Sequence, residues 1–410
     1  MFEAVQVNRE ITGQGRNLLL CGDGSAPLSG LLANYAARAQ CVYIDPPFMT
    51  GDSFTRRRRF GQAGWRTGFP APEYPAYADR HGTRDAYLAF LRGLIENAHR
   101  LLDRTGVLAL HLDWRTSAYG RLLCDEVFGE ELFLNEIIWS YESGGRAKKY
   151  FSRKHDTILL YARTKNYRFD LTRVPLERTE HRKNHMRRSV DENGRAYSEI
   201  KTGGKIYRYY DDAPVYPGDV WTDISHLQQR DPERTGYATQ KPLKLLDRIL
   251  RPVVTSGDLV VDLCCGSGTA LEAAQALGCR FIGMDACPEA ILTAASRLEC
   301  TDLTLECPCT PDSTQLEGIC TGEGGMLLLT GFTATHPSFP RTEQAMDTLE
   351  SWSSGHIEGD TFVVSECFRR TRRTPELPLF CLVAQGEHVP AVSTVDAAGR
   401  RRVFCWKQNT

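Results

Sequence analysis

The sequence lacks a long apolar run. The longest runs, such as 106–112 and 259–263, are far shorter than the roughly 20 residues that a membrane-spanning helix needs. The first residues include Glu3 and Arg9 and do not follow the basic-then-apolar order of a secretory signal. We therefore expect a soluble, cytoplasmic chain that does not contact membranes. Its 14 scattered cysteines then favour free thiols in a reducing compartment.

Motifs for several common chemistries are also missing. The chain has no G-x-x-x-x-G-K-[ST] loop, which argues against ATP hydrolysis, and no H-E-x-x-H zinc site. Cys300, Cys307, Cys309 and Cys320 are spaced by 7, 2 and 11 positions, and this matches no paired C-x-x-C framework. We therefore expect no metal. His111 lies within an apolar run and is interpreted as a core residue.

An excess of charge of either sign is absent as well. The 410 residues hold 50 Lys+Arg against 51 Asp+Glu, and 41% of them are hydrophobic, which is an ordinary composition for a globular chain of two or three domains. Nucleic acid would therefore have to bind a local patch. Residues 144–208 form such a patch, with 18 Lys+Arg and 7 Asp+Glu, a difference of +11, interspersed with aromatic residues.

Apolar periodicity predicts the general architecture. Strands and helices alternate over the first 165 residues and again over 237–298, which is typical of an α/β domain with a mainly parallel sheet. The expected strands here are 41–44, 107–112, 134–140 and 156–162, and the expected helices are 84–103 and 117–128. Short β-like runs after residue 300 predict a mostly β appendage, at 326–329, 361–364, 379–383 and 402–406.

Residues 259–285 have the pattern of a nucleotide-binding βαβ unit. A buried strand enters a turn with Gly266 and Gly268, a helix follows, and a second strand ends at Asp285. Asp262 and Asp285 are 23 residues apart, close to the roughly 20 of such units, and the second acidic residue can accept hydrogen bonds from a ribose. Because a third glycine is missing, a turn that binds no ligand remains an alternative.

A second candidate segment follows the strand 41–44. Asp45, Pro46, Pro47 and Phe48 stand at its carboxyl end, where open α/β sheets bind ligands. A carboxylate, carbonyls next to prolines and an aromatic ring suit a planar molecule that carries an amino group. A turn that only ends the strand is the alternative.

These segments together resemble the β class of amino DNA methyltransferases. Asp45-Pro46-Pro47-Phe48, followed by Thr50-Gly51, is similar to their catalytic D-P-P-[YF] motif, and residues 262–269 are similar to their S-adenosylmethionine loop. Thr239-Gln240-Lys241-Pro242 resembles the Q-K-P element of the same family. The order, with the catalytic motif first and the cofactor loop last, is that of the β class. Residues 106–112, 122–131, 135–139 and 154–161 are similar to modification subunits of type III restriction systems, and the likeness covers about residues 15–295.

The resemblance implies a Rossmann-like S-adenosylmethionine-dependent methyltransferase fold with an inserted target-recognition region and a mostly β C-terminal appendage. The expected parts are a catalytic half at 1–165, a basic recognition insertion at 166–235, a cofactor-binding half at 236–299 and an accessory domain at 300–410. The implied catalytic residues are Asp45, Pro46, Pro47 and Phe48. The implied cofactor-binding residues are Gln240, Lys241, Pro242, Asp262, Cys264, Gly266, Gly268, Thr269 and Asp285. The expected DNA-binding residues are Arg56, Arg57, Arg58, Lys148, Lys149, Arg153 and Lys154.

The implied reaction is transfer of a methyl group from S-adenosylmethionine to the N6 amine of an adenine flipped out of double-stranded DNA. Cytosine-N4 methylation is the chemical alternative, and a DNA-binding subunit with little turnover is the alternative from another class. The family's partners also include a second copy of the chain and a restriction subunit, and its location is the bacterial or phage-infected cytoplasm, at the nucleoid.

This chain departs from the family pattern at one point. Family members commonly have D-P-F-x-G-S-G-T at the cofactor loop, whereas Leu263, Cys264 and Cys265 occupy its middle here. With no aromatic residue in the loop, we expect a looser cofactor pocket and weaker cofactor binding.

Overall fold

The computed structural model gives the structure of most of the chain. It describes residues 1–51, 53–57, 61–66, 73–78, 82–141, 147–176, 186–228, 231–235, 237, 239–298, 302–310, 314–320, 325–334, 345–371, 374–383 and 388–407. Within 53–57 and 73–78, and at 63, 65, 66 and 345, the description is limited to the backbone.

A mainly parallel sheet forms the middle of the molecule, as the alternation of strands and helices predicts. Its strands lie in the order β16 (Leu303–Glu306), β3 (Asn17–Cys21), β15 (Arg280–Asp285), β14 (Leu259–Asp262), β4 (Ala39–Ile44), β7 (Leu102–Asp113), β9 (His155–Ala162), β8 (Phe133–Ser140) and β13 (Val220–Trp221). Only β9 runs antiparallel to its two neighbours among these strands.

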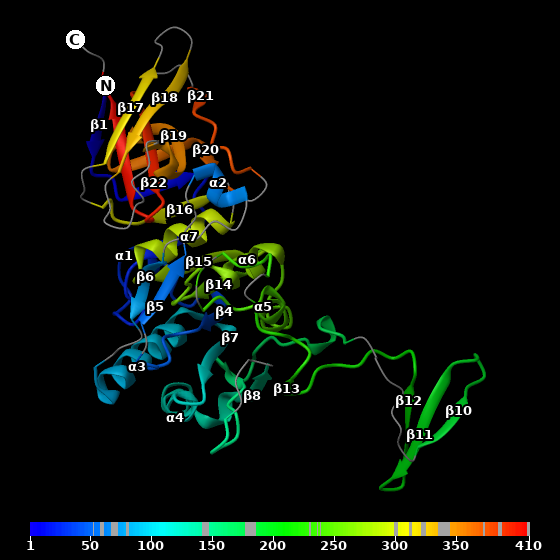
Figure 1. Ribbon diagram of the computed structural model, residues 1–410. Helices are drawn as coiled ribbons and strands as arrows, with labels where there is room; N and C mark the ends of the chain where they lie inside the picture. The colour runs from blue at the N-terminus through cyan, green and yellow to red at the C-terminus, as the bar shows by residue number, and fades with distance from the viewer. Residues whose placement is uncertain are drawn as a thin grey trace.

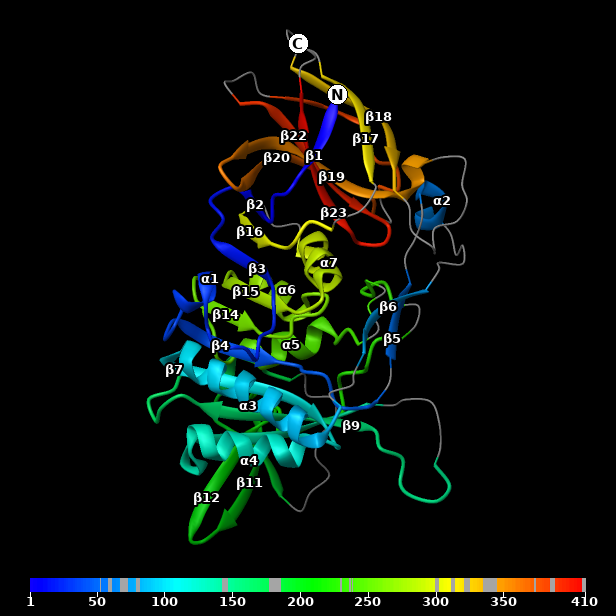
Figure 2. The ribbon, with the colours of Figure 1, turned by 90° about the vertical axis from the view of Figure 1, so that its left-hand side faces the viewer.

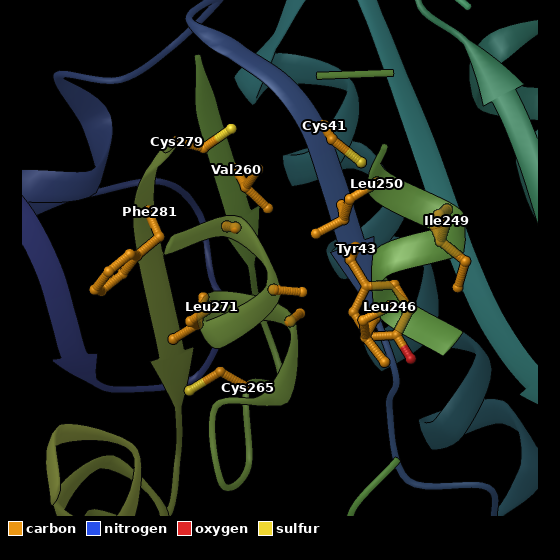
Figure 3. Packing of buried hydrophobic residues seen from close by; sticks show 14 of the residues in the cluster. Cys41, Tyr43, Leu246, Ile249, Leu250, Val260, Cys265, Leu271, Cys279 and Phe281 are labelled. Carbon is orange, nitrogen blue, oxygen red and sulfur yellow. The ribbon is translucent and has the colours of Figure 1, made fainter. Parts of the chain in front are cut away.

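Helices cover both faces of this sheet, so its strands are buried on both sides. On β4, Val42 and Ile44 face a core with α3 (Arg84–Leu101) and α4 (Ser117–Phe128). Cys41 and Tyr43 face the opposite core, which holds α5 (Leu243–Leu250), α6 (Thr269–Ala276) and α7 (Pro288–Leu298). Figure 3 shows α5 and α6 packed on this second face. The short helix α1 (Gly30–Ala33) packs on the first face through Leu32.

The C-terminal strands continue the same hydrogen-bonded sheet beyond β16. The order there is β2 (Arg9–Thr12), β20 (Thr361–Arg369), β19 (Leu349–Glu358), β22 (Pro390–Asp396), β23 (Arg401–Trp406) and β1 (Phe2–Val5). A smaller sheet of β17 (Gln315–Cys320), β18 (Met326–Thr333) and β21 (Phe380–Leu382) packs beside them. The expected β-rich character of this region is confirmed, and the strands nearest the N-terminus also belong to it (Figure 1).

Two other segments leave the central sheet. The sheet of β10 (Arg187–Val190), β11 (Ala196–Thr202) and β12 (Lys205–Tyr210) stands away from the body of the molecule (Figure 1). The hairpin β5 (Ser53–Arg57) and β6 (Glu73–Ala78) follows the Asp45 segment, and α2 (Gly61–Arg66) lies between its two strands in the sequence. Helix α2 lies against the C-terminal region (Figure 2), where Gln62 donates a hydrogen bond to Glu376.

The remaining elements are three short 3-10 turns, at Glu130–Leu132, Leu171–Arg173 and Ala345–Thr348. None of the helices in the described part of the chain is both long and apolar enough to span a bilayer.

Candidate active site

The two candidate segments open at the same edge of the sheet. Strands β4 and β14 are parallel neighbours, with Val42 paired with Val261 and Tyr43 paired with Asp262. Their carboxyl ends therefore meet, although Asp45 and Asp262 are 217 positions apart in the sequence. Both strands are fully buried. Each of these short apolar strands continues directly into a polar loop at this edge, where open α/β sheets bind ligands.

A cavity of about 710 Å³ lies between these loops. Of the residues predicted as catalytic or cofactor-binding, those that line it are Asp45, Pro47, Gln240, Lys241, Asp262, Cys264, Gly266, Thr269 and Asp285. The other four belong to the same loops without lining the cavity, namely Pro46, Phe48, Pro242 and Gly268. Most of the residues predicted from the sequence therefore line this one cavity.

Lys241 joins the two halves of the site. Its Nζ donates to both carboxylate oxygens of Asp45, at 2.8 and 2.7 Å, and both side chains are largely buried, with 12% and 17% of their surface exposed. The same ammonium lies 5.0 Å from the centre of the Phe48 ring. A residue that sequence assigned to the cofactor therefore contacts two of the predicted catalytic residues.

The glycines of the 262–269 loop meet two separate requirements. Gly266 and Gly268 have φ values of +50° and +81°, which residues with a side chain rarely adopt. A Cβ on Gly268 would also lie 2.9 Å from that of Ala294 on α7. The backbone of this loop is fixed further by Asp285, whose carboxylate accepts hydrogen bonds from the N–H groups of Gly266 and Cys287, both at 2.9 Å.

Buried acidic groups dominate the electrostatics of the cavity. Burial raises the pKa of Asp262 well above its usual range, and the nearby charges of Asp45 and Asp285 act in the same direction, against a hydrogen bond from the Cys264 N–H. Burial likewise raises the pKa of Asp285. Burial also raises the pKa of the Cys264 thiol, so this cysteine is a neutral, weakly polar part of the wall rather than a nucleophile.

The cavity fits the expected cofactor. S-adenosylmethionine carries a sulfonium, an ammonium and ribose hydroxyls, and these groups are complementary to a wall that holds Asp23, Asp45, Asp262 and Asp285. Phe90 and Tyr237 also line the cavity, and the Tyr237 ring is 3.3 Å from the position of a Cβ on Gly266. Other segments therefore supply aromatic rings to the cavity, although the 263–265 loop has none.

Three of the predicted cofactor residues also make contacts that shape the site. The side chain of Gln240 accepts from Thr235 N–H at 2.8 Å and donates to the Glu233 carbonyl at 2.8 Å. Pro242 is the N-cap of α5. Thr269 Oγ1 accepts from Arg297, a residue with 7% of its side chain exposed, at 2.8 Å. The Gln240 contacts fix the 233–242 segment internally, and the Thr269 contact joins α6 to α7.

Asp23 and Ser25 are cavity residues that the sequence reasoning missed. They follow β3, whose neighbour β15 pairs Asp285 with Cys21. A signal was present, because the apolar run 18–20 ends in a Gly-Asp-Gly turn, the same strand-then-turn pattern as in the cofactor loop. Phe90 on α3 and Tyr237 carried no comparable signal.

The predicted DNA-binding residues fall in two places. Lys148, Lys149 and Arg153 are exposed on the loop between β8 and β9, and Lys154 is half-buried there. Arg56 and Arg57 lie on β5, where only the backbone is described, and Arg58 lies outside the described residues.

Aromatic rings accompany the basic side chains of the β8–β9 loop. Tyr150 and Phe151 are 62% and 97% exposed, and the Arg153 guanidinium lies 3.6 Å from the centre of the Trp114 ring. Exposed rings beside cations are typical of surfaces that bind nucleic acid.

The projecting sheet β10–β12 holds a second part of the basic segment. Arg188, Arg195 and Arg208 pair with Asp211, Asp212 and Glu199. Arg187, Lys201 and Lys205 lie on its strands without an ion pair to any described residue. The basic residues of 144–208 are therefore divided between the edge of the central sheet and a separate arm.

One group of possible metal ligands occurs among the described residues, in the C-terminal region. It consists of His356, Glu358 and His388, whose ligand atoms lie within 4.8 Å of one another. The two imidazole rings are stacked, with centres 4.3 Å apart and planes at 14°. Because parallel stacked rings cannot both point their nitrogens at one ion, this arrangement does not form a metal site as it stands.

Comparison with known proteins agrees with the geometry. Residues 39–296 match the family model for N6/N4 methyltransferases, described as DNA methylase. The chain is 26% identical to the DNA adenine methyltransferase YhdJ of Escherichia coli K12 over 298 residues, which cover 70% of this chain and 84% of that protein. It is 23% identical to the StyLTI Mod subunit of a type III restriction-modification enzyme of Salmonella typhimurium, over 64% of this chain and 50% of that one.

Solved structures are among the similar proteins as well. The crystal structure of the M1.HpyAVI complex with S-adenosylmethionine matches 69% of this chain and 99% of its own, at 15% identity and a TM-score of 0.42. By its family and sequence matches, the chain is similar to DNA methyltransferases, Mod subunits among them, as its motifs indicated. It spans about half the length of the Mod subunit.

Proposed function

Because the chain belongs to the N6/N4 DNA methylase family, whose methyl donor is S-adenosylmethionine, we propose that it methylates the N6 amine of adenine at a specific site in double-stranded DNA. One observation carries the proposal, namely that Asp45 and the cofactor loop line the same cavity. An aspartate at position 45, in Asp-Pro-Pro-Phe, favours adenine over cytosine. The name of its relative YhdJ, a DNA adenine methyltransferase, supports the same choice.

The proposed catalytic residues act on the nucleophile. The exocyclic amine of adenine is a poor nucleophile because its lone pair is delocalised into the ring. The Asp45 carboxylate and the Pro46 carbonyl accept hydrogen bonds from the amine hydrogens and direct the lone pair outward. Phe48 stacks on the base. When bound, S-adenosylmethionine supplies an electrophilic methyl group on its sulfonium, so catalysis consists largely of positioning and electrostatic complementarity.

Lys241 has a defined part in this proposal. With its ammonium on both oxygens of Asp45, it orients the carboxylate, and one oxygen must be shared with the incoming amine. Lys241 is then a positioning residue for Asp45. The residues proposed to hold the cofactor are Gln240, Pro242, Asp262, Cys264, Gly266, Gly268, Thr269 and Asp285.

DNA reaches the site through the basic segments. We propose that Lys148, Lys149, Arg153 and Lys154 contact phosphates next to the flipped base, and that Arg56, Arg57 and Arg58 do so after the catalytic motif. The proposed parts of the chain are 1–165 and 236–299 for chemistry, 166–235 for recognition and 300–410 as accessory domain. Two exceptions to these bounds are that β1 and β2 pair with the C-terminal strands and that β16 belongs to the central sheet. A DNA substrate implies a place at the nucleoid of the cytoplasm, and Mod relatives suggest a restriction subunit or a second copy of the chain as partner.

Mass analysis of nucleosides tests this function. Genomic DNA without adenine methylation is incubated with the full chain and isotopically labelled S-adenosylmethionine, then digested. We expect labelled N6-methyladenine. Labelled N4-methylcytosine would mean that the chain acts on the N4 amine of cytosine instead. The absence of any methylated base would support a DNA-binding subunit with little turnover.

Asp45→Ala links the product to the proposed site. The variant should lose methyl transfer by at least about 100-fold and retain DNA binding, while Asp247→Ala, a surface change on α5, should leave both intact. Equal loss of transfer and DNA binding in Asp45→Ala would mean that Asp45 is structural.

A further inference from the structure

Four polar side chains form a buried row beneath the carboxyl edge of the central sheet. The row consists of Tyr43 on β4, His111 on β7, Asp156 on β9 and Tyr141 just after β8. The Tyr43 hydroxyl is 3.0 Å from His111 Nδ1, and His111 Nε2 is 3.1 Å from Asp156 Oδ2. The Tyr141 hydroxyl donates to Asp156 Oδ1 at 3.0 Å. His111 has no exposed surface, and Asp156 has 6%.

The hydrogen bonds of the row are mutually consistent. A neutral imidazole with its proton on Nε2 donates to Asp156 and accepts from the Tyr43 hydroxyl. Asp156 then accepts from both His111 and Tyr141. Burial alone would raise the pKa of Asp156, but the hydrogen bonds from His111 and Tyr141 and the positive charge of Lys241 outweigh it and lower that pKa. A fully partnered buried network of this kind is rigid and costly to break.

One end of the row lies at the catalytic segment. Tyr43 precedes Asp45 by two positions on β4, and its side chain points to the α5 face of the sheet (Figure 3). Ile44 pairs with Leu110, so the next positions along the two strands are Asp45 and His111. The His111 ring also stacks near that of Phe48, with centres 6.2 Å apart and planes at 28°.

The other end lies at the basic β8–β9 loop and at the segment that returns from the projecting arm. The backbone N–H of Tyr141 donates to the carbonyl of Lys154 at 3.0 Å, which closes the base of the loop. The Tyr141 ring lies 5.7 Å from that of His226. On β8, Trp139 Nε1 donates to the Ile224 carbonyl at 2.8 Å. The row thus spans from the catalytic strand to the segments that carry the basic and recognition residues.

We propose that His111 and Asp156 are positioning residues for methyl transfer, because through Tyr43 and Tyr141 they fix the catalytic strand β4 relative to the β8–β9 loop. DNA held by that loop then presents its flipped base in register with Asp45 and Phe48. This inference rests on the proposed function. It predicts that the hydrogen bond from Tyr141 to Asp156 affects the rate of methyl transfer, although Tyr141 lies outside the Asp45 and cofactor loops.

Removing single hydroxyl groups tests the proposal with little disturbance of the core. Tyr141→Phe deletes the bond to Asp156. Tyr161→Phe is the matched control, because Tyr161 lies on β9 with its hydroxyl on Asp125, on the α4 face of the sheet. The readouts are the single-turnover rate of methyl transfer to genomic DNA, the Kd for S-adenosylmethionine and the Kd for DNA. We expect Tyr141→Phe to slow transfer about tenfold with both Kd values unchanged, and Tyr161→Phe to transfer at the original rate.

Two substitutions at His111 separate the halves of the row. His111→Gln can keep a donor for Asp156, whereas His111→Asn can keep a polar atom for Tyr43. If both halves are needed, each variant should be slow in transfer while it still binds S-adenosylmethionine, which also reports that it is folded. Equal slowing by Tyr141→Phe and Tyr161→Phe, or no slowing by Tyr141→Phe, would overturn the positioning role. A wild-type chain that methylates no DNA would instead overturn the proposed function itself.

Discussion

Lys241 and Asp45 are in contact across 196 positions of sequence, and the contact gives Lys241 a role that differs from cofactor binding. We predict that Lys241→Met lowers kcat about 100-fold, because the carboxylate loses the group that orients it. The Kd for S-adenosylmethionine, measured by calorimetry, should change little. A cofactor-binding role would produce the reverse pattern, with a weakened Kd and a smaller change in kcat.

Lys244→Met provides the matched control for this prediction. Lys244 lies one turn further along the same segment, with 66% of its side chain exposed. The same chemical change there should alter neither kcat nor Kd.

Gly268 illustrates a second effect at the scale of one residue. Gly268 and Gly257 both have a positive φ, +81° and +88°, but a Cβ on Gly257 meets no atom within 4 Å. We predict that Gly257→Ala costs about 1 kcal/mol of stability from backbone strain alone. Gly268→Ala should cost at least about 1 kcal/mol more, because the new methyl group must also displace Ala294.

Chemical denaturation of the two variants measures the difference. Equal losses would mean that α7 moves aside without cost and that the close approach at Gly268 does not matter for stability.

The sequence motifs identified these residues but could not specify their contacts. Asp45, Asp262 and Asp285 could be predicted because each ends a buried strand, and parallel strands bring such ends to one edge. The contact of Lys241 with Asp45 could not be predicted, because its long, flexible side chain can extend either to the cofactor or to the catalytic segment. His111 was correctly interpreted as buried, but its partners lie on other strands, and spacing along the chain does not reveal them.

At the scale of elements, the β8–β9 loop combines basic side chains with exposed rings beside the cavity edge. We predict that Lys148→Glu combined with Lys149→Glu weakens DNA binding and lowers the slope of log K against log salt by about 2, since each phosphate contact contributes about 0.9. Fluorescence anisotropy at several salt concentrations measures both quantities.

Lys165→Glu serves as the control for the loop. Lys165 is exposed in the turn after β9, and because β9 runs antiparallel to β7, this turn lies at the opposite edge of the sheet. An effect of Lys165→Glu as large as that of the double variant would indicate a general charge effect and would exclude the loop as a specific contact.

Composition revealed the positive charge of 144–208 but not its division between two elements. A count of charges has no spatial content, so it does not register that β9, a buried strand of the central sheet, separates the loop from the arm. The helices α3 and α4, in contrast, could be predicted nearly to their ends because a full apolar stripe recurs over 18 and 12 residues.

At the scale of the whole molecule, Arg401 ties the N-terminal strands to the C-terminal region. Its side chain has no exposed surface, donates to Glu10 at 3.0 Å and donates to the Val7 carbonyl at 2.7 Å. We predict that Arg401→Met destabilises the chain by about 3 kcal/mol, because the largely buried Glu10 carboxylate loses its cationic partner.

The control is Arg9→Met, which removes a more exposed ion pair between β2 and Glu306 on β16 and should cost about 0 to 1 kcal/mol. Thermal unfolding of both variants measures the difference. Similar midpoints would mean that water replaces the Arg401 contacts.

The continuous sheet is the feature that sequence reasoning could least anticipate. Strands β1 and β2 are four residues each, too short for a periodicity to be recognised. Their partners β23 and β20 lie more than 340 positions away. Local patterns predict strands but not which distant strand completes a pair.

This pairing sets an order on biosynthesis. Phe2 is synthesised 404 positions before its partner Trp406. At roughly 5 to 20 residues per second, the early strands stay unpaired for tens of seconds, exposed to aggregation or to chaperones. The central α/β layers have most of their strands by residue 285, so they can assemble during translation, whereas β1 can pair with β23 only after residue 406 has been made.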